Sequence, residues 1–374
     1  MTSKPRLIID RNIPYLKGIL EPFALTEYLP AENICNETVK NADGLLIRTR
    51  TKVNEALLKD SSIRFVASAT IGFDHIDREY CSKTGISVFN APGCNAGSVQ
   101  QYIASALMIL LKKEQKFSEI TLGIVGVGHT GTKVKQFAEA IGMKVLLNDP
   151  PRQRKEKNDD FVSLEHLLSE SDIISFHIPL TFDGQDATFE LLSEKNYLLI
   201  KSGAAIINAS RGEVCNEEIL KKLVIEKDCT LALDVWQHEP KPDRELIALS
   251  KIATPHIAGY SADGKANASK MIVEKAAGFF GLDLNLLNFP EIPLPQTDII
   301  EPVNGSFEEI ISESILHTYN VLQDSDNLKN CSENFESLRN NYPLRREFSA
   351  FKIKSANLPS NTIQTLIKLG FQTI

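Results

Sequence analysis

The stretch Gly123-Ile124-Val125-Gly126-Val127-Gly128-His129-Thr130-Gly131 contains three glycines in the spacing GxGxxG. An apolar run precedes it, and an amphipathic segment that ends at Gly142 follows it. In a strand, turn and helix of this kind, the glycines permit a tight turn, a close approach of the backbone to a pyrophosphate, and close packing of helix on strand. The amides at the start of the helix face the anion. The stretch therefore predicts a dinucleotide site, and the residues expected at the cofactor are Gly126, Gly128, His129, Thr130 and Gly131.

Asp149 bears on which dinucleotide binds. It follows the next predicted strand, residues 144–148, roughly twenty residues after the first glycine, where an acid accepts hydrogen bonds from the adenine ribose. A carboxylate there repels the 2′-phosphate of NADP, so NAD is the expected cofactor, although Arg152 and Arg154 nearby slightly weaken that inference. A methyltransferase also places a glycine loop before an acid, and only the remaining motifs separate the two functions.

Short apolar runs alternate with helical segments over most of the chain. Before residue 95 the predicted strands lie at 7–9, 44–47, 65–67 and 86–89, and beyond residue 120 they lie at 122–127, 144–148, 173–176, 204–208 and 231–235. Strands separated by helices pair in parallel, and the helices cover the faces of the sheet. The expected fold is therefore α/β, with two Rossmann-like, doubly wound parallel-sheet domains.

A long helix, predicted from Asn95 to Lys113 because apolar residues recur there at helical spacing, links the two domains. We expect a flavodoxin-like domain at residues 1–95, completed by residues 257–285, and a dinucleotide-binding Rossmann domain at residues 96–256. A proline-rich segment that reads as a linker follows. Residues 286–374 are expected to form a third, small α+β domain.

Composition and charge exclude several other classes of protein. A net charge of −7 argues against a surface that neutralises phosphates, so no nucleic-acid partner is expected. The apolar run nearest the N-terminus, Leu7-Ile8-Ile9, is far too short for a signal peptide or a membrane span. We therefore expect a cytoplasmic protein without a membrane partner. The six cysteines form no CxxC pair and no ligand-like spacing with the seven histidines, so no metal site is expected.

Three polar motifs follow predicted strands of the second sheet, at residues 208–212, 234–240 and 254–260. Ligands of an open α/β sheet bind at the carboxyl ends of its strands, so we expect these motifs to meet in one cleft. Arg211, Glu239 and His256 form the expected catalytic set. Each alone has an ordinary structural explanation, a surface charge or the start of a turn, whereas the three together beside a dinucleotide loop favour catalysis.

The set suits the oxidation of a 2-hydroxy acid. His256 is assigned as the base that takes the hydroxyl proton, and Glu239 as the carboxylate that stabilises the imidazolium so formed. Arg211 presents a planar fork that matches a carboxylate at two points. His177 is expected to line the nicotinamide side of the crevice.

Residues 68–260 resemble the D-2-hydroxyacid dehydrogenase family, both in these motifs and in the loop from Ala69 to Asp77. Segments 90–96, 256–261 and 335–348 resemble one branch of that family and extend the resemblance over nearly the whole chain. The resemblance implies NAD-dependent oxidation of 4-phospho-D-erythronate to 2-oxo-3-hydroxy-4-phosphobutanoate, a step of pyridoxal 5′-phosphate (vitamin B6) biosynthesis. It also implies that the first domain binds this small molecule and that the third forms a homodimer.

Carried over residue by residue, the resemblance implies that Thr49, Thr70 and Tyr260 bind the substrate. The residues that it implies at NAD are His129, Thr130, Asp149, Ile178, Ala209, Ser210, Arg211, Asp234 and Gly259. Asp234 would meet the carboxamide of the nicotinamide.

The chain departs from the pattern of that branch at three positions. Gln101 stands where relatives usually carry Glu, Ile178 where they carry Thr, and Thr49 where serine is expected. Gln101 keeps its hydrogen-bonding capacity but loses a charge, Ile178 leaves only its backbone to face the cofactor, and Thr49 keeps the hydroxyl.

The phosphate of such a substrate needs cationic partners. Arg48, Arg50 and Lys52 flank Thr49, and our hypothesis is that one of them binds it. Arg345 and Arg346 are alternatives, although a solvated pair is the more ordinary interpretation.

Two other functions stay open. Phosphoglycerate dehydrogenase or hydroxypyruvate reductase would share the catalytic set and the NAD fold, and the Arg345-Arg346 motif argues against both. An NAD-sensing binding protein or corepressor would keep the nucleotide loop without turnover. The complete set of Arg211, Glu239 and His256 argues against that.

Overall fold

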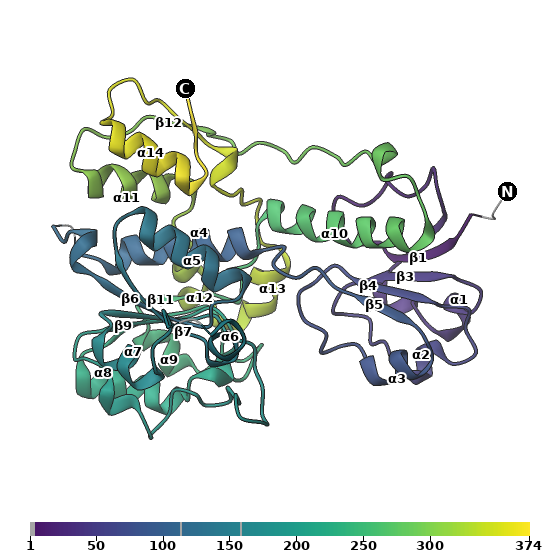
Figure 1. Cartoon of the computed structure of the whole chain (residues 1–374), viewed down its shortest axis with the longest axis horizontal. Helices are drawn as coiled ribbons and strands as arrows, with labels where there is room; N and C mark the ends of the chain where they lie inside the picture. Colours follow the sequence, from purple (N-terminus) through teal and green to yellow (C-terminus); the bar gives the residue numbers. More distant parts are fainter. Residues whose placement is uncertain (1–3, 113, 158) are drawn as a thin grey trace. The chain divides into compact units, whose positions relative to one another are not determined.

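The computed structural model describes residues 4–112, 114–157 and 159–374 (Figure 1). The chain divides into two compact units, which we call unit 1 (Met1–Asn95 with Ala262–Pro293) and unit 2 (Ala96–Ser261 with Leu294–Ile374). Every strand in the three sheets of the described residues pairs in parallel with its neighbours. The expected α/β class is confirmed. No helix of the described part is long and apolar enough to cross a bilayer.

Unit 1 contains a five-stranded sheet in the order β2-β1-β3-β4-β5. Its strands are β1 (Arg6–Asp10), β2 (Leu25–Leu29), β3 (Gly44–Ile47), β4 (Phe65–Ser68) and β5 (Ser87–Phe89). Its helices are α1 (Asn36–Val39), α2 (Glu55–Leu58), α3 (Arg78–Lys83) and α10 (Ala262–Phe280), and α10 packs against β4 (Figure 1). This strand order is that of flavodoxin-like doubly wound sheets.

Unit 2 contains a six-stranded sheet in the order β11-β10-β9-β8-β6-β7. Its strands are β6 (Thr121–Val125), β7 (Lys144–Asn148), β8 (Ile173–Phe176), β9 (Ala205–Asn208), β10 (Thr230–Leu233) and β11 (Ile252–Ala253). The chain moves outward from β6 to β7 and then returns to β8 on the other side of β6. Ligands of such sheets bind at this switch point, beyond the carboxyl ends of the two strands.

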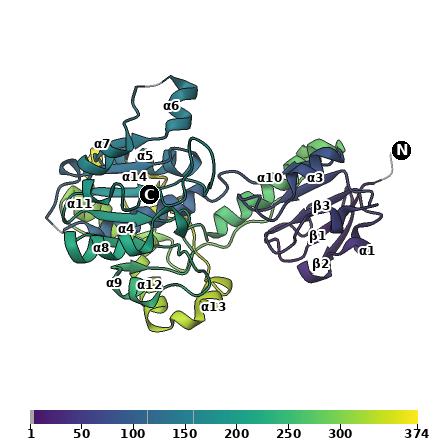
Figure 2. The same ribbon diagram turned by 90° about the horizontal axis from the view of Figure 1, so that it is seen from below.

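Helices surround this second sheet. They are α4 (Ala96–Leu110), α5 (His129–Ala140), α6 (Pro150–Glu156), α7 (Leu164–Glu170), α8 (Glu217–Lys227) and α9 (Arg244–Leu249). Within unit 2, α6 projects away from the rest (Figure 2). The long helix expected from Asn95 is α4, and Lys113, where it was expected to end, lies outside the described residues.

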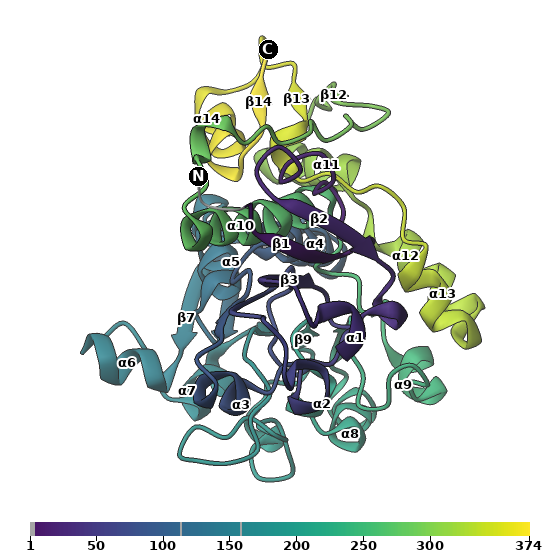
Figure 3. The same cartoon turned by 90° about the vertical axis from the view of Figure 1, so that its right-hand side faces the viewer.

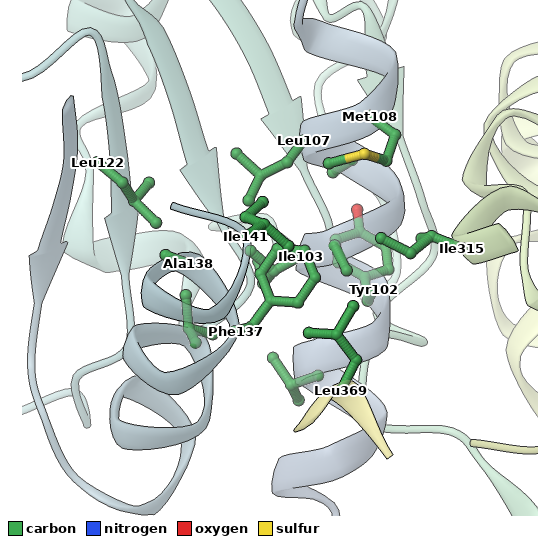
Figure 4. Packing of buried hydrophobic residues seen from close by; sticks show 14 of the residues in the cluster. Tyr102, Ile103, Leu107, Met108, Leu122, Phe137, Ala138, Ile141, Ile315 and Leu369 are labelled. Carbon is green, nitrogen blue, oxygen red and sulfur yellow. The ribbon is translucent and has the colours of Figure 1, made fainter. Parts of the chain in front are cut away.

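The C-terminal part of unit 2 adds β12 (Ile299–Ile300), β13 (Lys352–Ile353) and β14 (Gln372–Thr373), which lie side by side (Figure 3). It also adds α11 (Phe307–Thr318), α12 (Val321–Asn330), α13 (Phe335–Asn340) and α14 (Ser360–Leu369). α11 packs on α4 and α14 on α5. Ile315 and Leu369 thereby join Ile103 and Phe137 in one core cluster (Figure 4).

The expected domain limits differ from these units. Residues 257–261 belong to unit 2 rather than to the first domain, and residues 286–293 belong to unit 1. Residues 294–374 share a core cluster with the dinucleotide fold and fall within unit 2, and the third, small domain expected there stays a prediction. The linear pattern shows where an apolar face lies on a helix, but not which other helix covers it.

Candidate active site

The glycine turn lies at the switch point of unit 2. Gly126 has a φ of 88°, and a Cβ there would lie 2.6 Å from the carbonyl oxygen of His177. A Cβ on Gly131 would lie 2.0 Å from the carbonyl oxygen of Gly126. Gly128 is the N-cap of α5 and, having no side chain, makes no side-chain cap hydrogen bond. The first amides of α5 are therefore left to an anion, which is how such turns hold a pyrophosphate.

A cavity of about 760 Å³ opens beside this turn, between the start of α5 and α6. Asp149 stands in its wall, and its carboxylate accepts hydrogen bonds from Val127 N (2.8 Å) and Arg152 N (3.0 Å). Arg152 donates to Val127 O (2.6 Å) and pairs with Glu156, so its guanidinium is already engaged. The open cradle over the glycines and the carboxylate in its wall fit the adenosine half of NAD.

The residues after β8 form the other side of the switch point. His177 Nε2 lies 2.9 Å from Ser175 Oγ, and desolvation lowers the pKa of His177 to about 3, so its imidazole is neutral at pH 7. A Cβ on Gly126 would lie 2.4 Å from Ile178 Cγ2. The side chain of Ile178, and not only its backbone, therefore borders the glycine turn.

Arg211, Glu239 and His256 line one cavity of about 170 Å³ at the ends of β9, β10 and β11. The His256 Nδ1 atom lies 2.8 Å from Glu239 Oε2, with both side chains partly buried. Arg211 Nη1 donates to the carbonyl of Ser210 at 2.7 Å. The three motifs expected to converge from separate strand ends thus meet in this unit.

Close backbone packing holds Arg211 against the Glu239 loop. A Cβ on Gly212 would lie 2.0 Å from the carbonyl carbon of Trp236, so this approach requires glycine. The buried indole of Trp236 donates to Thr254 O at 3.0 Å, and the Trp236 amide donates to Glu239 Oε1 at 3.2 Å. Trp236 therefore connects the loop that carries Glu239 with the segment that leads to His256.

Asp234 and Arg345 hold the loop that carries His256, whose φ is 58°. Asp234, 1% exposed, accepts hydrogen bonds from Ile257 N and Ala258 N, each at 2.8 Å. Burial raises the pKa of Asp234, and the nearby His256 and these donors partly oppose that rise. Arg345 Nη2 donates to the carbonyls of Ile257 (3.3 Å) and Ala258 (2.6 Å).

Arg345 lies between aromatic rings. Its guanidinium carbon is 4.5 Å from the ring centroid of Tyr319 and 5.6 Å from that of Tyr342. Asp324 accepts a hydrogen bond of 2.7 Å from each of these tyrosine hydroxyls. Arg345 and Arg346 are only 5% and 9% exposed, so the interpretation of a solvated pair was wrong. Tyr342 lies three residues before Arg345, whereas Tyr319 comes from a more distant segment, so the local sequence does not show that the two rings enclose Arg345.

Arg339 on α13 is a neighbour of the site for which no role was predicted. Its Nε donates to the hydroxyl of Tyr260 at 3.0 Å, and its Nη1 lies 3.9 Å from Glu239 Oε2. The guanidinium also lies 5.7 Å from the centre of the Tyr260 ring. Arg339 lies within segment 335–348, and that resemblance was the one signal that could have drawn attention to it.

The other expected substrate residues lie in unit 1. Thr49 is exposed after β3, and Thr70 follows the adjacent strand β4, where its Oγ1 lies 2.6 Å from Ser68 Oγ. Both therefore occupy the same edge of the first sheet. Arg48 pairs with the buried carboxylate of Asp10 at 3.0 Å.

Gln101, on α4, is fully buried. Its Nε2 donates to the carbonyl of Arg346 (2.8 Å) and to Thr318 Oγ1 (3.1 Å). Its Oε1 has no hydrogen-bond partner in the described part of the chain. The position therefore joins α4 to the C-terminal segment.

Comparison with known proteins agrees with this geometry. Residues 109–258 match the family described as D-isomer specific 2-hydroxyacid dehydrogenase, NAD binding domain, and residues 289–370 match a domain of unknown function. An erythronate-4-phosphate dehydrogenase of Bacteroides thetaiotaomicron is 45% identical over 93% of this chain and 99% of its own. The chain belongs to the D-isomer specific 2-hydroxyacid dehydrogenase family.

Further members of the family show how far the likeness extends. Another erythronate-4-phosphate dehydrogenase, from Hydrogenovibrio crunogenus, is 36% identical over the full length of both chains. The D-lactate dehydrogenase of Aquifex aeolicus, solved with NAD and lactic acid, has a TM-score of 0.57 and 26% identity over 77% of this chain and 99% of its own. The NAD⁺-bound 3-phosphoglycerate dehydrogenase of Entamoeba histolytica has a TM-score of 0.60 and 27% identity over 75% of this chain and 96% of its own.

These relatives confirm the expected family, the resemblance to erythronate-4-phosphate dehydrogenases, and NAD as the cofactor. The protein is an NAD-dependent oxidoreductase of this dehydrogenase family. The individual roles of its site residues stay predictions.

Proposed function

We propose that this dehydrogenase oxidises 4-phospho-D-erythronate to 2-oxo-3-hydroxy-4-phosphobutanoate with NAD, in pyridoxal 5′-phosphate biosynthesis. The observation that carries the proposal is the His256 Nδ1 to Glu239 Oε2 contact of 2.8 Å in a cavity that Arg211 also lines. Relatives named for this activity, 36–45% identical over nearly the full chain, support the choice of substrate.

His256 is the proposed base. Because Glu239 accepts the proton on Nδ1, the lone pair of the neutral ring lies on Nε2, which takes the hydroxyl proton of the substrate. The carboxylate of Glu239 then stabilises the imidazolium. Arg211 binds the substrate carboxylate at two points. NAD, when bound, supplies the two-electron acceptor.

The proposed cofactor contacts divide between the two sides of the switch point. On the glycine side they are Gly126, Gly128, His129, Thr130, Gly131 and Asp149. On the other side they are Ile178, Ala209, Ser210, Arg211, Asp234 and Gly259. Ser210 is bound by its amide and its hydroxyl to Asn208 Oδ1 (3.0 and 2.8 Å), which fixes the turn before Arg211. Thr49, Thr70 and Tyr260 are the proposed substrate contacts.

The test is the absorbance of NADH on mixing the protein and NAD with 4-phosphoerythronate, 3-phosphoglycerate or D-glycerate. A parallel reaction contains a 2-oxo acid, which removes NADH that stays bound. Selective turnover of 4-phosphoerythronate is expected. Preference for 3-phosphoglycerate would instead favour a phosphoglycerate dehydrogenase, and NAD binding without any turnover would favour a sensor.

We further propose a cytoplasmic homodimer that forms through residues 286–374. Light scattering after size-exclusion chromatography tests the assembly, and a mass equal to one chain of 41.6 kDa would contradict it.

A further inference from the structure

The proposed substrate carries two anionic groups, a carboxylate and a phosphate. Arg211, whose fork suits a carboxylate, accounts for one of them. The following inference rests on the proposed function and concerns the cation that meets the second group.

Several arginines that were candidates for this role are engaged elsewhere. Arg48 pairs with the buried carboxylate of Asp10. Arg345 is 5% exposed, and its Nη2 is directed at two backbone carbonyls. Arg346 is 9% exposed. Arg50 and Lys52 are exposed in unit 1, next to the proposed substrate contact Thr49, and are the competing cations.

Arg339 lies in unit 2 with the catalytic set, and its side chain is 34% exposed. Its guanidinium lies 3.9 Å from Glu239 Oε2, and the same carboxylate oxygen lies 2.8 Å from His256 Nδ1. In 4-phosphoerythronate, four bonds separate the reacting carbon from phosphorus, a span of roughly 5 Å at ordinary bond lengths. The phosphate of a substrate whose hydroxyl meets Nε2 of His256 thus extends beyond the immediate surroundings of that ring, and Arg339, which contacts Glu239 and Tyr260, is a partly exposed cation beside them.

We propose that Arg339 binds the phosphate of the substrate and thereby selects phosphorylated 2-hydroxy acids. The hydroxyl and ring of Tyr260 hold its guanidinium at the edge of the site. Its charge also separates the phosphate from the carboxylate of Glu239, which would otherwise repel it. A planar guanidinium can bind two phosphate oxygens at once, whereas lysine offers a point charge.

The experiment compares Arg339→Gln and Arg339→Lys with the wild type, on 4-phosphoerythronate and on unphosphorylated D-erythronate. Loss of a charged hydrogen bond weakens binding by roughly 10- to 100-fold. We expect Arg339→Gln to raise the KM for 4-phosphoerythronate by about that factor, and Arg339→Lys by less. The kcat/KM for D-erythronate should change less than about two-fold, so discrimination between the two acids collapses. Calorimetric titration of the enzyme–NADH complex with 4-phosphoerythronate should show the same loss of affinity without turnover.

Arg244→Gln removes an exposed guanidinium from α9 and serves as the matched control. Arg50→Gln and Lys52→Gln test the competing cations. Equal losses on both substrates in Arg339→Gln would overturn the proposal, because the effect would then pass through Glu239 or Tyr260. The proposal would also be overturned if Arg339→Gln still preferred 4-phosphoerythronate over D-erythronate as strongly as the wild type does. It would likewise be overturned if Arg50→Gln alone lost this preference. If the wild-type enzyme did not oxidise 4-phosphoerythronate but oxidised another acid, the proposed function itself would be refuted. That result would be seen before any variant is made.

Discussion

Asp234 accepts the amide protons of Ile257 and Ala258, while Arg345 donates to the carbonyl oxygens of the same two residues. Two buried charges of opposite sign thus fix the backbone directly after His256. Since that histidine adopts a φ of 58°, which costs energy for a residue with a Cβ, its loop depends on surrounding contacts.

We expect Arg345→Met to lower kcat by at least about ten-fold through loss of this positioning, while NADH affinity changes little. Arg345→Lys retains the charge and should recover part of kcat. Stopped-flow turnover and NADH fluorescence titration measure the two quantities. The idea fails if kcat stays at the wild-type value in a folded Arg345→Met protein.

His256→Asn should lower kcat by about 10²- to 10⁴-fold, the usual contribution of a positioned base. Glu239→Gln, which keeps the shape but removes the charge next to Nδ1, should have a smaller effect. Both variants should still bind NADH, because neither residue contacts the cavity beside the glycine turn. Near wild-type kcat in His256→Asn would assign the base to another group.

Gly131→Ala should destabilise the fold by about 1–3 kcal/mol, because the new methyl group would overlap the Gly126 carbonyl. Gly128→Ala is the matched control, since a Cβ there meets no atom within 4 Å. Its thermal midpoint should equal that of the wild type, and only its affinity for NADH should fall. Equal midpoints for both variants would contradict the packing described for Gly131.

The lowered pKa of His177, about 3, predicts a pH dependence of stability. Below pH 6.5 the unfolded chain binds a proton that the folded state does not, so stability falls as the pH decreases from 6.5 towards 3. His75, whose pKa desolvation also lowers, acts in the same direction. Urea midpoints at pH 7.5 and 5.0 should therefore differ less in His177→Gln than in the wild type. An identical difference would mean that His177 is protonated in the native state.

Local pattern predicted much of this architecture. Nine strands could be predicted from apolar runs. The glycine turn and the catalytic set could be predicted from residues placed at strand ends. All of these are properties of short segments. Two strands of the two larger sheets were missed, and the three short strands β12, β13 and β14 of the C-terminal part were not located. β2 (Leu25–Leu29) is a partly exposed edge strand with Thr and Glu in its middle, and β11 (Ile252–Ala253) has only two residues. Neither gives the continuous apolar run typical of a central parallel strand.

Contacts between residues far apart in the chain could not be predicted from the sequence. The burial of Arg345 depends on Tyr319 and Tyr342, and the place of Arg339 beside Glu239 joins residues a hundred positions apart. Asp234 was expected at the nicotinamide, yet its carboxylate also accepts three hydrogen bonds from the His256 segment. Such dual use is visible only once the loops are placed.

The shared core of unit 2 has a consequence for synthesis of the chain. α4 and α5 leave the ribosome with apolar faces that α11 and α14 later cover, and α14 begins at Ser360 whereas α5 ends at Ala140. At ordinary rates of translation this interval lasts roughly 10–40 s. Throughout it, the nascent dinucleotide fold displays an uncovered hydrophobic surface, so chaperones that shield such surfaces should raise the yield of active enzyme.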